Sequence, residues 1–257
     1  MKIHPTAIVH PKAQIDKDVE IGPYSIVGEN VKIGKNTVIG PHVVVDGWTE
    51  IGEENKIFQF ASIGSINQDL KYHGEEAYLK IGDRNTIRES VTMNIGTEGG
   101  GGITRVGDDN LFMVGAHIAH DCILGSRIII ANLGTLAGHI TIEDGAIVGG
   151  VVAIHQFCRI GKMAIIGGCS KIVQDIPPYM MADGHPAEVR GINLIGLKRK
   201  KYDRKDIQDI KEAHRIIYRS GLNTSQGIEK LKTELGESDQ VKEIIAFIEN
   251  TNRGITK

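Results

Sequence analysis

The stretch "IHPTAIVHPKAQIDKDVEIGPYSIVGENVKIGKNTVIGPHVV", residues 3–44, repeats a six-residue pattern. Each unit opens with an aliphatic residue and often has Gly at its second position. Its fifth residue is small or β-branched, as in Ala7, Val19 and Thr37. The same period resumes at Ile81 and again, in a shifted frame, at Val106. A period sustained over so much of the chain indicates a repeat architecture.

A period of six fits neither an α-helix nor an alternating strand of ordinary length. It predicts short strands joined by tight turns, with three hexads in each triangular coil and stacked coils about 4.8 Å apart. The first and fifth residues of each hexad would point inward, which places Cys122 and Cys158 in the core. Glycine at the second position would ease turns that need a positive φ. The pattern therefore predicts a parallel β-helix, whose coils bury their faces only by stacking.

Composition and charge narrow the class of protein. A formal net charge of -2 and a pI near 6.6 argue against general nucleic-acid binding. The start, "MKIHPTAIVHP", lacks the apolar core of a signal peptide. The longest apolar stretch, "AIVGGVVAI", has nine residues, whereas a membrane helix needs about 20. We therefore expect a cytoplasmic protein with no nucleic-acid partner and no integral membrane segment.

Two insertions interrupt the hexads, near residues 67–80 and 98–105. The first, "NQDLKYHGEEAYLK", is polar and contains Asp69 and Lys71, and solenoid insertions often lie on the binding face. We expect this insertion to reach the substrate. The second, "EGGGGIT", is glycine-rich and is expected to be flexible. It lacks the Gly-Lys-Ser/Thr ending of a phosphate loop and is not expected to hold a nucleotide.

The hexads fade in "IVQDIPPYMMADGHPAEV", where prolines and a Gly-His-Pro break regular structure. From Asp203, a good N-cap residue, the apolar period becomes helical. Helices are expected from Asp203 to about Gly221, then over residues 225–235 and 239–252. The expected organisation is a β-helix over residues 1–186 followed by a small helical domain over residues 187–257.

Several motifs together resemble one enzyme family across the whole chain. They are "GSINQDLKYHGE", "IGDRNTIRESVT", "AHIAHDC", "LAGHITIED", "IHQFCRIG" and "RGINLIGLKRKKY", in this order. They resemble the hexapeptide-repeat acyltransferases, and among them the acyl-carrier-protein-dependent UDP-N-acetylglucosamine 3-O-acyltransferases.

That resemblance implies a left-handed β-helix and a homotrimer with active sites between subunits. It also implies transfer of a 3-hydroxyacyl chain from acyl carrier protein to UDP-N-acetylglucosamine, the first step of lipid A synthesis, with no cofactor and no metal. Apolar residues expected to face outward, such as Phe58, Phe60 and Phe112, would favour lateral packing of the subunits.

Acyl transfer to a hydroxyl needs a base for the attacking oxygen and donors for the oxyanion of the intermediate. The resemblance implies that His120 is the base, that Asp121 orients its ring, and that the Gly138 amide is the oxyanion donor. Gly138 follows His120 by eighteen residues, which is one coil. The repeat spacing by itself therefore predicts that Gly138 stacks on His120.

Other site residues are expected from the resemblance alone. The expected substrate-binding residues on the sugar side are Asp69, Lys71, Asn94, His117, His139 and Gln156, and Gly168 would keep the acyl groove long. The nucleotide side comprises Asn193, Arg199 and Lys200. A basic cluster, Lys198–Lys201 with Arg204 and Lys205, would meet pyrophosphate and the acidic surface of acyl carrier protein. The chain departs from the family pattern at Asn94, where His is usual, and at Ile195 and Lys200, where Glu and Arg are usual.

Three alternatives stay open at this point. The acceptor could be the 3-amino analogue of the sugar, because Asn94 cannot titrate. A zinc-dependent carbonic anhydrase of the γ type could use His117, His120 and His139, although the basic cluster, the two insertions and the acidic neighbour of His120 argue against it. A non-catalytic scaffold would leave the clustering of His, Asp and Gln on adjacent coils unexplained.

Overall fold

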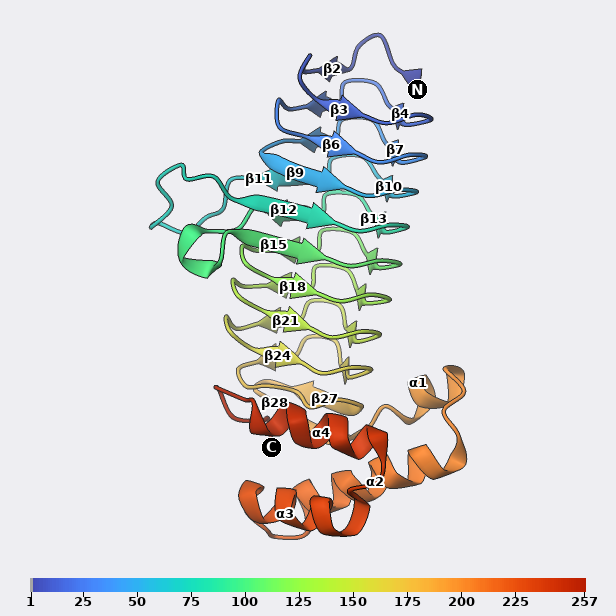
Figure 1. The fold of residues 1–257 in the computed structure, drawn as a ribbon, viewed down its shortest axis with the longest axis vertical. Helices are drawn as coiled ribbons and strands as arrows, with labels where there is room; N and C mark the ends of the chain where they lie inside the picture. The colour runs from blue at the N-terminus through green and yellow to red at the C-terminus, as the bar shows by residue number, and fades with distance from the viewer. Residues whose placement is uncertain (1) are drawn as a thin grey trace.

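A computed structural model describes residues 2–257, and its strands form three sheets wound around one core, parallel throughout except for the last strand of one sheet (Figure 1). We call these sheets walls 1, 2 and 3. Wall 1 comprises β1 (Lys2–Ile3), β4 (Glu20–Ile21), β7 (Val38–Ile39), β10 (Lys56–Ile57), β13 (Thr86–Ile87), β16 (Leu111–Phe112), β19 (Ile129–Ile130), β22 (Ile147–Val148), β25 (Ile165–Ile166), β27 (Met180–Gly184) and β28 (Ala187–Ile192).

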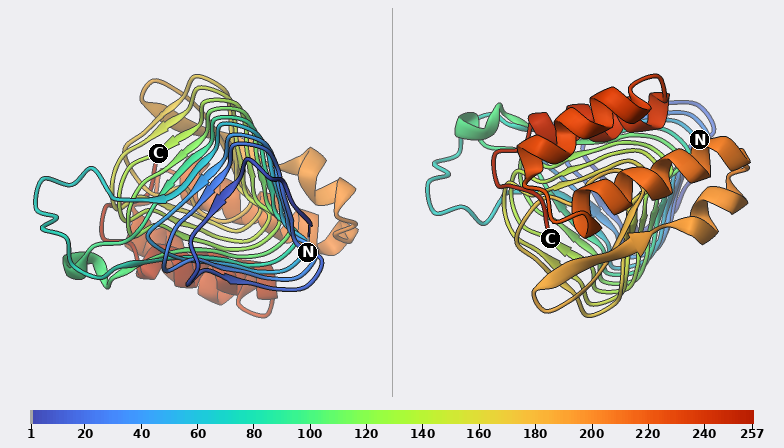
Figure 2. Two further views of the ribbon diagram at one scale, coloured as in Figure 1. Left: turned by 90° about the horizontal axis from the view of Figure 1, so that it is seen from above. Right: turned by 90° about the horizontal axis from the view of Figure 1, so that it is seen from below.

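Wall 2 comprises β2 (Ile8–Val9), β5 (Ile26–Val27), β8 (Val44–Val45), β11 (Ser62–Ser65), β14 (Thr92–Asn94), β17 (His117–Ile118), β20 (Thr135–Leu136), β23 (Ala153–Ile154) and β26 (Lys171–Ile172). Wall 3 comprises β3 (Gln14–Ile15), β6 (Lys32–Ile33), β9 (Trp48–Ile51), β12 (Tyr78–Ile81), β15 (Ile103–Val106), β18 (Ile123–Leu124), β21 (Thr141–Ile142) and β24 (Arg159–Ile160). Seen from either end, the walls enclose a triangular section (Figure 2). The predicted left-handed parallel β-helix with a helical end is confirmed.

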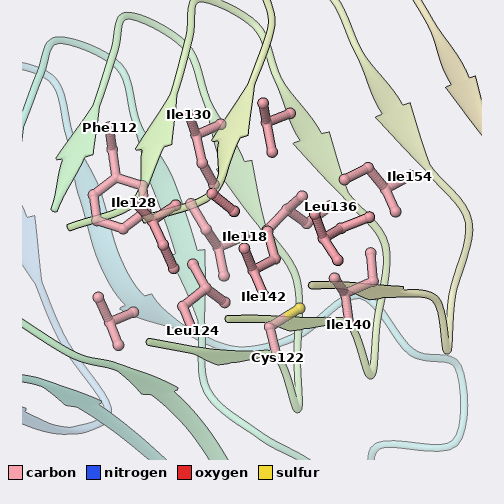
Figure 3. Packing of buried hydrophobic residues seen from close by; sticks show 14 of the residues in the cluster. Phe112, Ile118, Cys122, Leu124, Ile128, Ile130, Leu136, Ile140, Ile142 and Ile154 are labelled. Atoms are coloured by element: carbon pink, nitrogen blue, oxygen red, sulfur yellow. The ribbon is translucent and has the colours of Figure 1, made fainter. Parts of the chain in front are cut away.

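The first and fifth residues of the hexads fill the core, as predicted. Ile118, Cys122 and Leu124 all point into it, and their counterparts in the neighbouring coils stack against them (Figure 3). Burial raises the pKa of the Cys122 thiol to about 12 and that of the Cys158 thiol to about 11, so both stay protonated as core residues. Phe112 corrects our expectation, because it opens its hexad and is fully buried instead of facing outward.

Glycine is needed at the second position of the hexads for a different reason from the one we expected. The positive φ values of the turns fall on the fourth residue of the hexad, as at Asn36, His42 and Asp121, and these residues are not glycine. At Gly34, a Cβ atom would lie 2.7 Å from the backbone carbon of Gly52 in the next coil. Glycine is therefore needed because the coils approach closely there.

Both insertions leave the β-helix at the same edge, the corner between walls 2 and 3. The first lies between β11 and β12, and the second lies between β14 and β15 and contains the short 3-10 helix η1 (Glu98–Gly100). They project side by side from the stack (Figures 1 and 2). The strands of wall 3 continue in register beyond them, since Tyr78 pairs with Ile103 and Ile81 with Val106.

The C-terminal end closes the β-helix. The prolines and Gly-His-Pro, which we expected to end regular structure, lie in and before an antiparallel hairpin of β27 and β28 that extends wall 1. The expected domain boundary at residue 187 falls at the first residue of β28. Helices α1 (Leu194–Arg199), α2 (Arg204–Arg219), α3 (Thr224–Leu235) and α4 (Asp239–Glu249) follow, and Asp203 caps α2 as predicted. None of the helices among residues 2–257 is long and apolar enough to cross a membrane.

The close approach at Gly34 predicts a large effect of adding one methyl group. Gly34→Ala should lower the free energy of unfolding by roughly 1–3 kcal/mol, because its Cβ must displace the backbone of the next coil. Gly227→Ala in α3 is the matched control, since a Cβ there meets no atom within 4 Å, and it should leave stability unchanged or raised. Denaturant unfolding of both variants measures the difference. Equal stability of the two variants would contradict this account.

Candidate active site

The two insertions and the adjoining corner enclose a cleft of about 800 Å³. The residues that line this cleft come from the first insertion, the second insertion and two later coils. The lining residues are Asp69, Lys71, His73, Gly74, Glu75, Thr97, Glu98, Gly99, Gly100, His139 and Phe157. Of the histidines singled out from the sequence, His139 lines this cleft directly.

Asp121 lies at the floor of this region, and its side chain is fully buried. Oδ1 accepts a hydrogen bond from the Thr97 amide at 2.8 Å, and Oδ2 accepts one from the Thr97 hydroxyl at 2.7 Å. The Asp121 amide donates to the Thr104 hydroxyl at 2.8 Å. A buried carboxylate is costly unless donors surround it, and Thr97 supplies two donors to this one.

His120 precedes Asp121, and its ring is 14% exposed. Its Nδ1 lies 2.7 Å from Asp121 Oδ2. An ionised carboxylate only accepts hydrogen bonds, so the neutral ring must carry its proton on Nδ1. That tautomer leaves the Nε2 lone pair free, which is the arrangement of a general base.

Gly138 stacks on this ring, as the repeat spacing predicted. A Cβ atom at Gly138 would lie 2.6 Å from His120 Nε2 and 2.5 Å from Cε1, so any other residue would push the ring aside. Within residues 2–257 the Gly138 amide donates to no protein acceptor. Gln156 lies one further coil along the same corner and is exposed.

The other two histidines differ in their surroundings. His139 packs edge-on against His120, with 5.1 Å between ring centroids, and stacks on Phe157 at 4.5 Å. Burial lowers its pKa. His117 lies on β17, where its Nδ1 is 2.7 Å from the Thr92 hydroxyl, and burial followed by the nearby His120 lowers its pKa. Burial therefore disfavours the protonated form of both rings.

The first insertion brings Asp69 and Lys71 to the cleft. The Lys71 amide donates to Asp69 Oδ1 at 3.0 Å, and this hydrogen bond is the main reason that the pKa of Asp69 is lowered. The nearby His120 lowers the pKa of Asp69 further. Asp69 is thus an ionised acceptor that faces the same opening as His139.

Comparison with known proteins decides the family. A family model described as "Udp N-acetylglucosamine O-acyltransferase; Domain 2" matches residues 175–256. An acyl-[acyl-carrier-protein]–UDP-N-acetylglucosamine O-acyltransferase of Janthinobacterium sp. (strain Marseille) is 53% identical over 99% of each chain, and that of Herminiimonas arsenicoxydans is 52% identical over the same shares. The chain belongs to the UDP-N-acetylglucosamine O-acyltransferase family.

Solved structures of this acyltransferase family share the fold over the full length. LpxA from Acinetobacter baumannii superposes with a TM-score of 0.97 at 48% identity, covering 99% of each chain. UDP-N-acetylglucosamine O-acyltransferase from Moraxella catarrhalis gives a TM-score of 0.97 at 44% identity and covers 100% of each chain.

Several residues expected at the site of this acyltransferase lie elsewhere in the protomer. Asn193 is 4% exposed, caps α1 through the Gly196 amide, and donates to the Met163 carbonyl, so both polar groups of its side chain are already used. Arg199 and Lys200 are exposed at the end of α1. Helix α1 lies on the opposite side of the triangular section from the insertions (Figure 2). Gly168 is exposed at the corner between walls 1 and 2.

Asn94, which stands where the family usually has His, is 5% exposed. Its amide nitrogen donates to the Ser65 and Ile66 carbonyls, at the base of the first insertion. Its Oδ1 is buried and accepts no hydrogen bond from the described residues. In this acyltransferase Asn94 therefore supports the insertion from below, and its side chain is not among those that line the cleft.

The zinc alternative does not match the geometry. The three histidines do not converge. Instead, one set of potential ligand atoms lies within 4.8 Å of one another among residues 2–257, and it is formed by His120, Asp121 and His139. Both oxygens of Asp121 already accept hydrogen bonds from Thr97. Membership of the acyltransferase family removes the remaining reason for a carbonic anhydrase.

Sequence reasoning missed Thr97, Gly100 and Phe157. Phe157 is the fourth residue of its hexad, one coil beyond His139, and that spacing could have identified it. Gly100 belongs to the stretch that we expected to be flexible, and Thr97 directly precedes that stretch. A glycine run beside a Thr was the only available signal, and it does not reveal which residue the backbone will approach.

The lowered pKa values predict how the folded state of this acyltransferase responds to acid. His139 and His117 have folded pKa values below the ordinary value of 6.5, so the unfolded chain binds more protons as the pH falls through 6.5. The stability that they contribute is complete above that pH and is lost below it. The free energy of unfolding should therefore fall between pH 7.5 and 5.5, and His139→Gln should reduce this fall. Denaturant unfolding at both pH values tests this, and an unchanged slope in the variant would contradict it.

Proposed function

We propose that this acyltransferase moves a 3-hydroxyacyl chain from acyl carrier protein to the 3-hydroxyl of UDP-N-acetylglucosamine, the first step of lipid A synthesis, with His120 as the general base. The observation that carries this proposal is the His120–Asp121 pair, with Nε2 free and Gly138 stacked on the ring. The names of the relatives, at 52–53% identity over nearly the whole chain, support the donor and acceptor.

The proton transfers of the proposed reaction use His120, Asp121 and Gly138 of this chain together with the two substrates. His120 Nε2 takes the proton of the sugar hydroxyl as its oxygen attacks the thioester carbonyl carbon. The resulting oxyanion accepts a hydrogen bond from the Gly138 amide, which no protein acceptor uses among residues 2–257. The carbon–sulfur bond then breaks, and the proton on His120 passes to the leaving thiolate. Asp121 stabilises the imidazolium that exists between these two transfers.

We also propose a cytoplasmic homotrimer in which each cleft is completed by a neighbouring subunit. Large apolar side chains are exposed along the corner between walls 1 and 2, namely Tyr24, Phe60, Leu133 and Val151. A neighbour packed there would cover them. The same packing would let Arg199 and Lys200 of one subunit approach the nucleotide bound to another, while the remaining basic cluster faces acyl carrier protein.

The trimer has a direct test. Sedimentation equilibrium of the purified chain should give about three times the monomer mass of 28.0 kDa. Leu133→Glu places a charge on the exposed corner and should shift the chain toward smaller species, because an unpaired charge would be buried at the interface. A fully active monomer would contradict the shared cleft.

Loss of the base should remove turnover and spare the fold. His120→Ala is expected to lower kcat by roughly 100- to 10,000-fold, the usual contribution of a general base. Its KM for UDP-N-acetylglucosamine and its unfolding midpoint should stay close to those of the parent. Steady-state assays with a 3-hydroxyacyl carrier protein measure this effect.

His4→Ala is the matched control for that variant, because His4 is an exposed histidine in the first coil, far along the β-helix from the pair, and it should retain activity. Near-normal kcat in His120→Ala would refute the base. The same assay run with the 3-amino sugar decides the acceptor. A preference of about tenfold or more for the amine, equivalent to about 1.4 kcal/mol, would overturn 3-O-acylation.

A further inference from the structure

The second insertion meets the proposed catalytic pair at Thr97 and Gly100, and Thr97 is the one of the two that hydrogen-bonds to the Asp121 carboxylate. The Thr97 hydroxyl accepts a hydrogen bond from the Gly100 amide at 3.2 Å and lies 2.7 Å from Asp121 Oδ2. The amide hydrogen occupies the acceptor side of the hydroxyl, so its one proton is directed at the carboxylate. Thr97 therefore supplies two donors to Asp121, one from its side chain and one from its backbone.

Gly100 allows this contact. A Cβ atom at residue 100 would lie 2.1 Å from Asp121 Cγ, which means that the backbone of η1 passes directly over the carboxylate. At the adjacent Gly99, a Cβ atom would meet nothing within 4 Å. Two neighbouring glycines thus differ completely in what they touch, and only one of them closes the site over Asp121.

The first insertion is tied to the same structure. The side-chain Nδ2 of Asn67 donates a hydrogen bond to the carbonyl of Gly96, the residue before Thr97, at 3.0 Å. The Oδ1 of Asn67 accepts a hydrogen bond from the backbone amide of Asp69 at 3.1 Å. Asn67 is 6% exposed. A continuous chain of hydrogen bonds therefore runs from Asp69 through Asn67 and Thr97 to Asp121 and His120.

We propose that Thr97 is a positioning residue for His120. The two hydrogen bonds from Thr97 fix the orientation of the Asp121 carboxylate, so that its Oδ2 faces His120 Nδ1. This contact keeps the proton of the neutral His120 ring on Nδ1. The lone pair of Nε2 then points toward the cleft. Thr97 acts through Asp121 and does not exchange a proton with the substrate. This inference rests on the proposed function of His120 as the base.

The hydroxyl can be removed without changing the shape of the side chain. Thr97→Val keeps the backbone donor but loses the O–H, and kcat should fall roughly ten- to a hundredfold, as for the loss of a hydrogen bond to a charged group. KM for UDP-N-acetylglucosamine should not change. Thr97→Ser restores the hydroxyl and should recover most of kcat. Thr86→Val on the outer face of β13 is the matched control and should behave as the parent.

Two results would overturn the proposal. One is an unchanged kcat in Thr97→Val, and the other is a Thr97→Ser variant as slow as Thr97→Val although both are folded. If Thr97→Val does not fold, a comparison of kcat between Gly100→Ala and Gly99→Ala tests the proposal instead. Gly100→Ala should lower kcat because its Cβ displaces the carboxylate, whereas Gly99→Ala should leave kcat unchanged. Equal activity of these two glycine variants would also overturn the proposal.

A measurement without turnover separates this proposal from the assigned reaction. Diethyl pyrocarbonate modifies unprotonated imidazole nitrogens, and peptide mass spectrometry follows His120 with the neighbouring His139 as an internal reference. Modification of His120 relative to His139 should be slower in Thr97→Val than in the parent and in Thr97→Ser. Equal or faster modification would count against Thr97. Absence of turnover in the parent chain would instead refute the proposed function.

Discussion

Hydrogen bonding between successive coils is the constraint on which the rest of the structure depends. The amide of Ile26 donates to the carbonyl of Val43, and the amide of Gly40 to that of Ile57, so each coil is held by the next and not by itself. Every residue therefore has a fixed neighbour one coil away, and side chains form columns. Position in a column explains why Gly34 must lack a Cβ atom and why Gly138 lies against His120.

Insertions are tolerated only where this pairing is interrupted anyway. A strand residue within a wall hydrogen-bonds to the coils on both sides of it. At a corner, extra residues can be inserted if the chain re-enters the next strand in register. Both insertions use the corner between walls 2 and 3. They are bordered by β9, β12 and β15, the four-residue strands of wall 3, which pair along their whole length. The longer strands provide a rigid edge beside which the cleft can form.

The repeat allowed most of the β-helix to be predicted, because its signal recurs in every hexad. Burial of Cys122 and stacking of Gly138 follow from register alone. The outward placement predicted for Phe112 was wrong. Phe112 is the opening residue of its hexad, and that position points into the core even when its side chain is as large as phenylalanine.

Contacts outside the repeat could not be predicted in this way. Thr97 meets Asp121, which is 24 residues away along the chain, only because η1 folds back over the corner. The Gly-His-Pro segment likewise indicated a break from local propensity, but β27 found a partner in β25 and continued the wall. In both cases tertiary pairing decided a conformation that the local residues leave open.

The corner also explains how two adjacent residues can form the proposed catalytic pair. Successive side chains of an extended strand point to opposite faces, so a strand would separate His120 from Asp121. Asp121 is the fourth residue of its hexad and has a φ of 59°, a left-handed conformation that Asp tolerates better than most residues. This turn brings the carboxylate beneath its own neighbour, 2.7 Å from Nδ1. His117, only three residues earlier, is still on β17 and bonds to Thr92 in the preceding coil. The two histidines of "HIAHD" thus belong to different surfaces, a wall and a corner, and only the corner can unite a histidine with the buried charge that orients it.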